Sequence, residues 1–138
     1  MNNAALFAAA ARLMSETPEV DEVRFSTLRF QHCRQCGYVR SPESPLCPEC
    51  LSEESDWLED SGAGTIWSWC IYHRAYDDAF KEVIPYNVAL VELDSGPRLI
   101  SNVLNTNELR IGQRVVVVPK EVAPDRFLLY FELANGVA

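Results

Sequence analysis

The stretch CRQCGYVRSPESPLCPEC, residues 33–50, holds four cysteines in two C-x-x-C pairs. Cys33 and Cys36 form the first pair, and Cys47 and Cys50 form the second. A C-x-x-C turn presents two thiolates from one tight bend, and two such turns complete the tetrahedral coordination of a zinc ion. The same cysteines could instead form two disulfides, so the redox compartment of the chain decides between the two chemistries.

Composition favours the metal site. The chain has 138 residues, 48% of them hydrophobic, which is enough for a core that needs no disulfides to fold. Arg12 interrupts the N-terminal apolar run, no basic stretch precedes that run as in a secretory signal, and no segment approaches the roughly 20 apolar residues of a membrane span. We therefore expect a cytoplasmic protein, in which thiols stay reduced and paired C-x-x-C motifs bind metal.

The four cysteines fill every position of a tetrahedral site, which is typical of structural rather than catalytic zinc. Iron in a rubredoxin-like site of four sulfurs stays open as the alternative. Gly37 follows the first pair, where a flexible residue lets backbone N–H groups turn toward the sulfurs. Leu51 stands at the equivalent place after the second pair, so this turn departs from the usual C-x-x-C-G form.

The charge of the chain argues against nucleic acid as its partner. The formal net charge is −8, and residues 1–60 carry 5 Lys and Arg against 11 Asp and Glu. The segment SEESDWLED, residues 52–60, holds five of these acids. Nonspecific affinity for phosphates depends on clustered Lys and Arg, so single-stranded nucleic-acid binding is the weakest of the functions considered. We interpret residues 52–60 as a solvated face.

The rest of the chain predicts one helix and five strands. Residues 3–14 are Ala-rich and favour a helix, which must pack on its own domain or on a partner subunit to persist. From residue 61 the sequence alternates between apolar and polar residues, which is typical of β-strands. The predicted strands are 64–75, 86–94, 98–104, 113–120 and 126–133. Five strands in a small domain predict a compact antiparallel barrel.

Several sequence motifs outside the cysteine pairs resemble those of one known family. Four motifs follow the two C-x-x-C pairs and Trp57 in this order: SGAGTIWSW (61–69), HRAY (73–76), IPYNVALVELDSGPRLISN (84–102) and IGQRVVVV (111–118). Together they resemble the acyl-CoA-associated family in which a rubredoxin-like zinc ribbon precedes a C-terminal OB-fold. The resemblance covers about residues 25–133 and implies a mainly β fold. We expect an N-terminal helix and linker (1–24), a zinc ribbon (25–60), and a five-stranded OB-fold barrel with a short tail (61–138).

The resemblance also implies a function. Members of this family accompany thiolase-like enzymes or a hydratase of the hot-dog fold, in archaeal mevalonate synthesis, acyl transfer and steroid side-chain degradation. We therefore expect a noncatalytic accessory subunit of an enzyme that acts on acyl-CoA in lipid, steroid or polyketide metabolism. A standalone acyl-CoA-binding module is the alternative. Fold resemblance by itself does not decide between them.

The residues themselves do not indicate catalysis. His32 lies beside the ribbon, where the four cysteines leave it no ligand role. His73 ends the first predicted strand, and a base needs a nucleophile in reach. Cys70 is the nearby thiol, but three residues along a strand separate the two by roughly 10 Å, on opposite faces. We interpret Cys70 as a small core hydrophobe, and we expect Trp67 and Trp69, two positions apart, to share a face of their strand.

The long loop at 73–86 is the candidate binding surface. Aromatic rings in it could stack on an adenine, and its cations could meet a CoA phosphate or anchor a partner subunit. An interface is the favoured reading, because the loop has no Gly-rich phosphate cradle. The candidate ligand or partner residues are His73, Arg74, Tyr76, Phe80, Lys81 and Tyr86, with Arg98 nearby.

Overall fold

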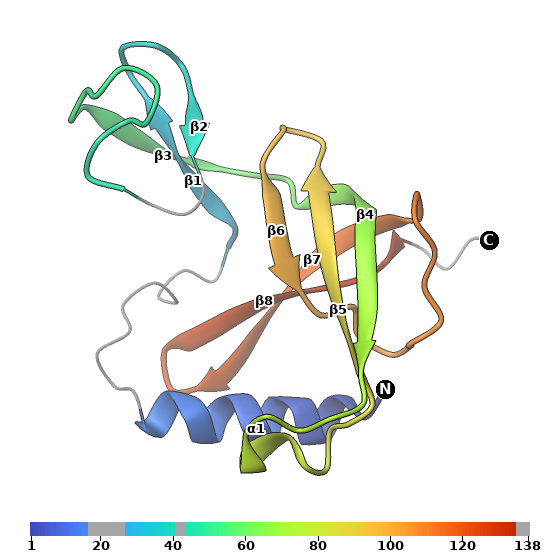
Figure 1. Cartoon of the computed structure of the whole chain (residues 1–138). Coiled ribbons are helices and arrows are strands. Elements are labelled where there is room, and N and C mark those ends of the chain that lie inside the picture. Colours follow the sequence, from blue (N-terminus) through green and yellow to red (C-terminus); the bar gives the residue numbers. More distant parts are fainter. Residues whose placement is uncertain (17–26, 41–43, 135–138) are drawn as a thin grey trace.

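The computed structural model describes residues 1–16, 27–40 and 44–134 (Figure 1). A single long helix, α1 (Asn3–Glu16), precedes two sheets. The smaller sheet consists of β1 (Arg29–Cys33), β2 (Val39–Arg40) and β3 (Ser55–Glu59). The larger sheet contains β4 (Ala63–Tyr72), β5 (Tyr86–Leu93), β6 (Arg98–Ser101), β7 (Arg114–Ala123) and β8 (Arg126–Leu133), and a short 3₁₀ turn, η1 (Asp78–Phe80), lies between β4 and β5.

The mainly β architecture with an N-terminal helix is confirmed. All five predicted barrel strands are present, and their ends differ from the predicted ones by at most three residues. The acidic segment 52–60 was expected only as a solvated face. In the structure it forms β3, which pairs antiparallel with β1 through five residue pairs and keeps most of its side chains exposed. The predicted linker after the helix, residues 17–24, lies outside the described residues.

The larger sheet curls into a nearly closed OB-type barrel. Its strand order is β6-β5-β4-β7-β8, and every pairing is antiparallel. The segment after β6 closes the barrel against β8: Val103 forms a parallel bridge with Phe131, and the Leu104 amide donates to the Phe131 carbonyl at 2.7 Å. This order, in which the third strand returns to the fifth, is that of the predicted OB-fold.

The ribbon and the barrel share one hydrophobic core. Leu28 and Phe30, at the start of the ribbon, are buried in the same cluster as the barrel residues Ile66, Val91 and Phe131. Phe30 of β1 and Leu28 just before it therefore belong to the core of the barrel, so the two parts are not independently packed.

Helix α1 packs on its own chain. Leu6 and Ala9 are buried in a second cluster with Val83 of the loop between β4 and β5, Leu104 after β6 and Tyr130 of β8. Figure 1 shows the helix beneath β8 and beside the loop that holds η1. This burial stabilises a helix of 14 residues that would be marginal by itself in water. Within the described parts of the chain, no helix has the length and apolar character needed to cross a membrane.

A buried amide fixes the crossover between β6 and β7. The Asn87 side chain is fully buried, and its Nδ2 donates to the carbonyls of Val103 and Thr106, both at 2.8 Å. Its Oδ1 accepts from the Val103 amide at 2.7 Å. Because a buried polar group without partners is costly, these bonds specify one path for the crossover.

A β-bulge in β4 decides which of its side chains point outward. Ile66 pairs with Val91 and Ser68 pairs with Leu90, so Trp67 is an extra residue opposite no partner.

The bulge overturns two expectations from the sequence. The prediction that Trp67 and Trp69 share a face is wrong, because Trp67 is 49% exposed whereas Trp69 packs against the barrel core. The interpretation of Cys70 as a core residue is also wrong: its thiol is exposed. The extra residue shifts the alternation by one position and turns Cys70 to the outside.

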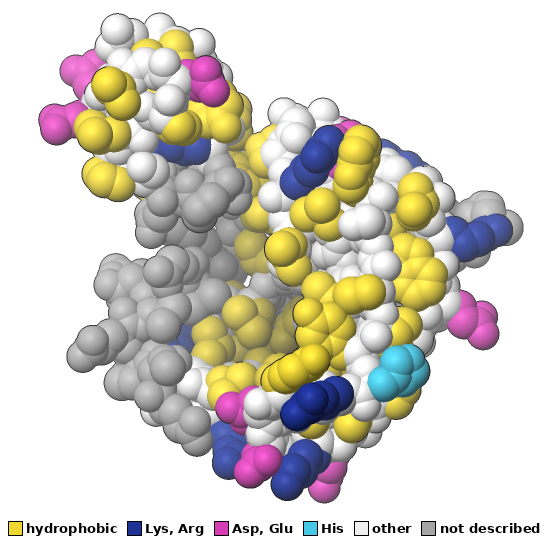
Figure 2. Space-filling view, in the orientation of Figure 1, with side chains coloured by type: hydrophobic (Ala, Val, Ile, Leu, Met, Phe, Trp, Pro, Cys, Tyr) yellow, Lys and Arg dark blue, Asp and Glu magenta, His cyan; other side chains and the backbone are white. Residues whose placement is uncertain are grey.

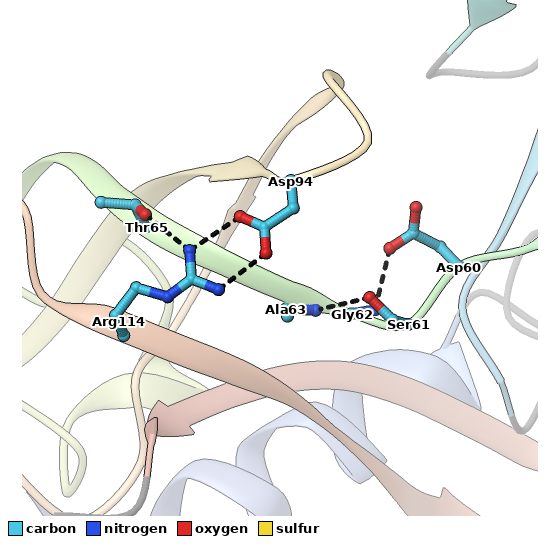
Figure 3. A network of polar contacts seen from close by, with 7 residues as sticks. All are labelled: Asp60, Ser61, Gly62, Ala63, Thr65, Asp94 and Arg114. Atoms are coloured by element: carbon cyan, nitrogen blue, oxygen red, sulfur yellow. Dashed lines mark hydrogen bonds and ion pairs between the residues drawn. The ribbon is translucent and has the colours of Figure 1, made fainter. Parts of the chain in front are cut away.

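Polar contacts fix the junction between the ribbon and the barrel (Figure 3). Asp60, directly after β3, accepts a hydrogen bond from the Gly62 amide at 2.8 Å and another from the Ser95 hydroxyl in the turn after β5. Nearby, Arg114 forms a two-pronged ion pair with Asp94, with both N···O distances 2.7 Å. The hydrogen bond from this guanidinium lowers the pKa of the Asp94 carboxyl below its usual value.

Gly62 is the residue at this junction that tolerates substitution least. It adopts φ +75°, and a Cβ there would lie 2.1 Å from Cγ1 of Val117. We expect Gly62→Ala to lower the free energy of unfolding by about 2–4 kcal/mol, through left-handed strain and overpacking together. Gly112→Ala is the matched control, because Gly112 also has a positive φ but open space around it. Chemical denaturation checks both, and equal losses in the two variants would contradict the packing argument.

Candidate metal centre and partner surface

Two matching backbone turns present the four cysteines. In the first turn the Gly37 amide donates to the Cys33 carbonyl at 3.0 Å, and in the second the Leu51 amide donates to the Cys47 carbonyl at 2.8 Å. Gly37 has φ +81° and Leu51 has φ +64°. The second turn therefore keeps the knuckle geometry even though a leucine, which disfavours positive φ, occupies the glycine position.

The sulfur atoms have the spacing of a metal site. Sγ of Cys33 lies 3.6 Å from Sγ of Cys50, and Sγ of Cys36 lies 3.6 Å from Sγ of Cys47. All four ligand atoms lie within 4.8 Å of one another. A tetrahedral zinc ion with Zn–S bonds of about 2.3 Å requires sulfurs about 3.8 Å apart, whereas a disulfide requires about 2.05 Å. The residues fit one ion held by four sulfurs.

The backbone also favours the thiolate form that binds metal. The Cys36 amide donates to Sγ of Cys33 at 3.5 Å, and this contact is the largest of several causes that lower the pKa of the Cys33 thiol to about 6, while the pKa of the Cys36 thiol is raised to about 12. Cys33 and Cys47 are buried, so water does not compete for their sulfurs. A bound zinc ion would hold the two knuckles together and, because its ligands are four cysteines, would have no open position for a substrate.

A polar contact supports the segment that leads to the second knuckle. Oε1 of the buried Gln31, on β1, accepts from Nε of Arg40 at 3.1 Å and from the Ser44 amide at 2.7 Å. These bonds tie β1, β2 and residue 44 together, and they position the chain that enters Cys47.

The loop predicted as a binding surface builds a row of aromatic rings. The Arg74 guanidinium lies 5.3 Å from the Tyr76 ring, and Tyr76 meets Tyr72 edge-on at 6.1 Å. Tyr72 lies 5.2 Å from Tyr86, which lies 5.2 Å from Phe80. Four of the predicted residues are therefore brought together. Tyr72 was missed; its signal was its place at the end of the strand that precedes the loop.

Three predicted residues lie apart from this row. His73 is exposed and makes no hydrogen bond with the described side chains. Lys81 pairs with Asp78 inside the loop at 3.3 Å. Arg98 lies on β6, where its guanidinium stacks 3.9 Å above the ring of Trp67. Trp67 therefore contacts Arg98 of the candidate surface, although the sequence did not assign Trp67 to that surface.

No pair of groups with the geometry of a nucleophile and its base occurs among the described residues. Neither His32 nor His73 hydrogen-bonds to a described side chain, and the thiol of Cys70 points to solvent without a base beside it. The arrangement can hold a metal and present a surface to another molecule.

Comparison with known proteins identifies the family. The rubredoxin-like zinc ribbon domain of ChsH2 matches residues 26–56, and the C-terminal OB-fold domain of ChsH2 matches residues 57–119. A DUF35 domain-containing scaffold protein of Methanothermobacter thermautotrophicus is 37% identical over 93 residues, which are 65% of this chain and 69% of the relative. The chain belongs to the DUF35 family of ribbon and OB-fold proteins.

Two further relatives are named for enzymes. A probable enoyl-CoA hydratase alpha subunit of Thermomonospora curvata is 37% identical over 109 residues, which are 78% of this chain but 34% of that subunit. The DUF35 chain thus spans about a third of this curated relative. A solved chain of the Ltp2-ChsH2(DUF35) aldolase superposes with a TM-score of 0.70 at 32% identity, covering 94% of this chain and 93% of the other.

The metal centre predicts a defined response to losing one ligand. Cys47→Ala leaves three sulfurs, and we expect the chain to lose its bound metal. Because Leu28 and Phe30 couple the ribbon to the barrel core, the loss should reach the barrel. We expect about 3 kcal/mol less stability, or about 10 °C in Tm. Elemental analysis and thermal unfolding measure both. Cys70→Ala, which removes the exposed thiol outside the cluster, should keep the metal and the Tm; full metal occupancy in Cys47→Ala would refute the ligand set.

The leucine at the second knuckle predicts a stabilising substitution. Leu51 is 70% exposed and has a left-handed backbone, so Leu51→Gly removes strain and loses little packing. We expect the free energy of unfolding to rise by about 0.5–1 kcal/mol. Gly37→Ala at the first knuckle should lower the free energy of unfolding by about 1 kcal/mol, because an alanine is strained at φ +81°. The added Cβ would meet only Nε2 of His32 at 4.0 Å, so overpacking adds nothing to this loss. Denaturant titration of the metal-loaded chains tests the opposite signs, and a destabilised Leu51→Gly would reject this account.

Proposed function

We propose that this DUF35 chain is a noncatalytic subunit that assembles with an acyl-CoA enzyme of the thiolase-like or hot-dog hydratase kind. The observation that carries the proposal is the match to the Ltp2-ChsH2(DUF35) aldolase chain, because it extends over 94% of this chain and includes helix, ribbon and barrel. The relatives named as scaffold protein and as hydratase alpha subunit support the same role. The four thiol ligands favour the cytoplasm, where they stay reduced.

The chemistry of the described residues supports a structural role. The metal centre has the four sulfurs of a closed site, so a zinc ion there would stabilise the ribbon and leave no position for substrate. The histidines lack the nucleophile and orienting group that acid–base catalysis needs. What the chain offers to solvent is an aromatic surface with cations at its edges, which is the composition of an interface.

One observation favours a second candidate, a chain that binds acyl-CoA by itself. Tyr76 is 76% exposed and carries the Arg74 guanidinium against its ring. An exposed ring beside a cation could stack on adenine and pair with a phosphate. This candidate predicts that the isolated chain binds CoA thioesters, whereas the subunit role does not require it.

Purification of the tagged, metal-loaded chain from its host tests the proposal. We expect an acyl-CoA enzyme to co-purify at a fixed stoichiometry. The recombinant enzyme should lose solubility or turnover without this chain and regain it when the chain is added, and the isolated chain should turn over no acyl-CoA. Turnover by the isolated chain would overturn the noncatalytic assignment. A solitary chain that binds CoA thioesters in calorimetry would replace the subunit role with the second candidate.

A further inference from the structure

Apolar side chains gather on the side of β4, β5 and β6 that points away from the barrel core, and we call this side the outer face. It consists of residues whose side chains point away from the barrel core or lie at the end of these strands: Trp67, Cys70, Tyr72, Tyr76, Leu90 and Ile100. Figure 2 shows hydrophobic side chains gathered over these strands, with basic side chains above and below them.

Strand register makes this surface continuous. Leu90, in the middle of β5, pairs with Ser68 of β4 on one side and with Ile100 of β6 on the other. On β5, Ala89 and Val91 point into the core, so Leu90 between them must point outward. Ile100 is 75% exposed, although a β-branched aliphatic side chain gains most from burial. Leu90 and Ile100 thus form an outward-facing apolar pair on β5 and β6, next to Ser68 of β4, which lies between Trp67 and Cys70 in the chain.

A cation lies at each end of the outer face. At one end the Arg98 guanidinium stacks on Trp67 at 3.9 Å and Nε donates to Glu92 at 3.1 Å. At the other end Arg74 stacks on Tyr76, and no carboxylate of the described residues forms an ion pair with it. Because Glu92 already pairs with Arg98, Arg74 is the cation of the outer face that no described carboxylate neutralises.

We propose that the outer face is the docking surface for the catalytic subunit, and that the subunit meets it with an apolar patch flanked by carboxylates. The inference rests on the proposed function and specifies which part of the chain makes the contact. Aromatic and arginine side chains at the two ends would act as anchors, and the aliphatic centre would exclude water around them. A carboxylate opposite Arg74 would neutralise a cation that has no ion-pair partner among the described residues, and one near Arg98 would share the guanidinium with Glu92.

A second copy of this chain is a poorer occupant. Two copies that pair through the same face are related by a two-fold axis, so each end of the face in one copy meets an end of the same face in the other copy. Both ends carry an arginine, and Arg74 or Arg98 would then face another arginine. Each copy also brings a net charge of −8. Like charges at both ends and over the whole chain oppose this pairing.

The test measures the affinity of the purified chain for the enzyme subunit that co-purifies with it. Ile100→Glu places a carboxylate in the aliphatic centre, and we expect binding at least about 30-fold weaker. Ile111→Glu is the matched control, because Ile111 in the turn before β7 is 71% exposed and belongs neither to the outer face nor to the metal centre. It should bind as the wild type does. Thermal unfolding of both variants shows that the fold is kept.

Charge reversal tests the complementarity. Arg74→Glu should weaken binding about tenfold or more, with the difference shrinking at high salt. Lys81→Glu is the control, since Lys81 already pairs with Asp78 inside the loop. Unchanged affinity in both Arg74→Glu and Ile100→Glu, while the wild type still assembles, would overturn the docking surface and leave the proposed function intact. If no acyl-CoA enzyme binds the wild type, both proposals fall.

Cys70 gives a readout that needs no substitution. It lies in the outer face with an exposed thiol, while the other four cysteines are in the metal cluster. A maleimide should label Cys70 rapidly in the free, metal-loaded chain, and at least about tenfold more slowly once the catalytic subunit is bound. Peptide mapping locates the label. Equal labelling rates with and without a saturating amount of the subunit would show that the outer face stays open and would reject the inference.

Discussion

Phe30 reaches from the ribbon into the core of the barrel, and with Leu28 it ties the metal centre to the rest of the chain. A ribbon that held only its own metal could rotate on its linker. Here β1 contributes side chains to the barrel interior before it ends at Cys33, so the position of the first ligand depends on barrel packing. The contacts of Asp60 with Gly62 and Ser95 add a second attachment on the exit side. Metal binding and barrel folding are therefore coupled.

The bulge at Trp67 has the largest effect on the surface. A regular strand from Gly64 to Tyr72 would keep one alternation throughout, with even-numbered residues facing the core. The extra residue reverses that alternation, so Trp69 fills the core and Cys70 and Tyr72 face outward. One inserted position thus supplies both the tryptophan under Arg98 and the tyrosine that continues the aromatic row. Bulges that re-aim side chains in this way are common at functional edges of sheets.

The parts of this structure that sequence could predict are those fixed by local chemistry. The spacing of the four cysteines predicted a metal site, and the structure brings the four sulfurs together; alternation of apolar residues located the barrel strands within a few residues. Trp67 and Cys70 could not be placed, because a bulge changes the facing of a strand without changing its composition. Asn87 gave no signal either: its value lies in bonds to a crossover fifteen or more residues away. The partners of Leu28 and Phe30 were hidden for the same reason, since shared burial is a long-range property.

The distribution of satisfied and unsatisfied groups indicates which parts of this chain can bind another molecule. The sulfurs are arranged for one ion, the buried Asn87 has its hydrogen bonds, and the barrel interior is filled by its own side chains. On the outside, exposed aromatic and aliphatic side chains beside Arg74 and Arg98 still gain from contact, and inside the described residues the buried Nη1 and Nη2 of Arg40 have no hydrogen-bond partner. Apolar area left in water favours association, and it becomes specific only when charges fix the register. A chain with four thiols gathered for one ion and with an exposed apolar surface can bind a metal and present that surface to another molecule.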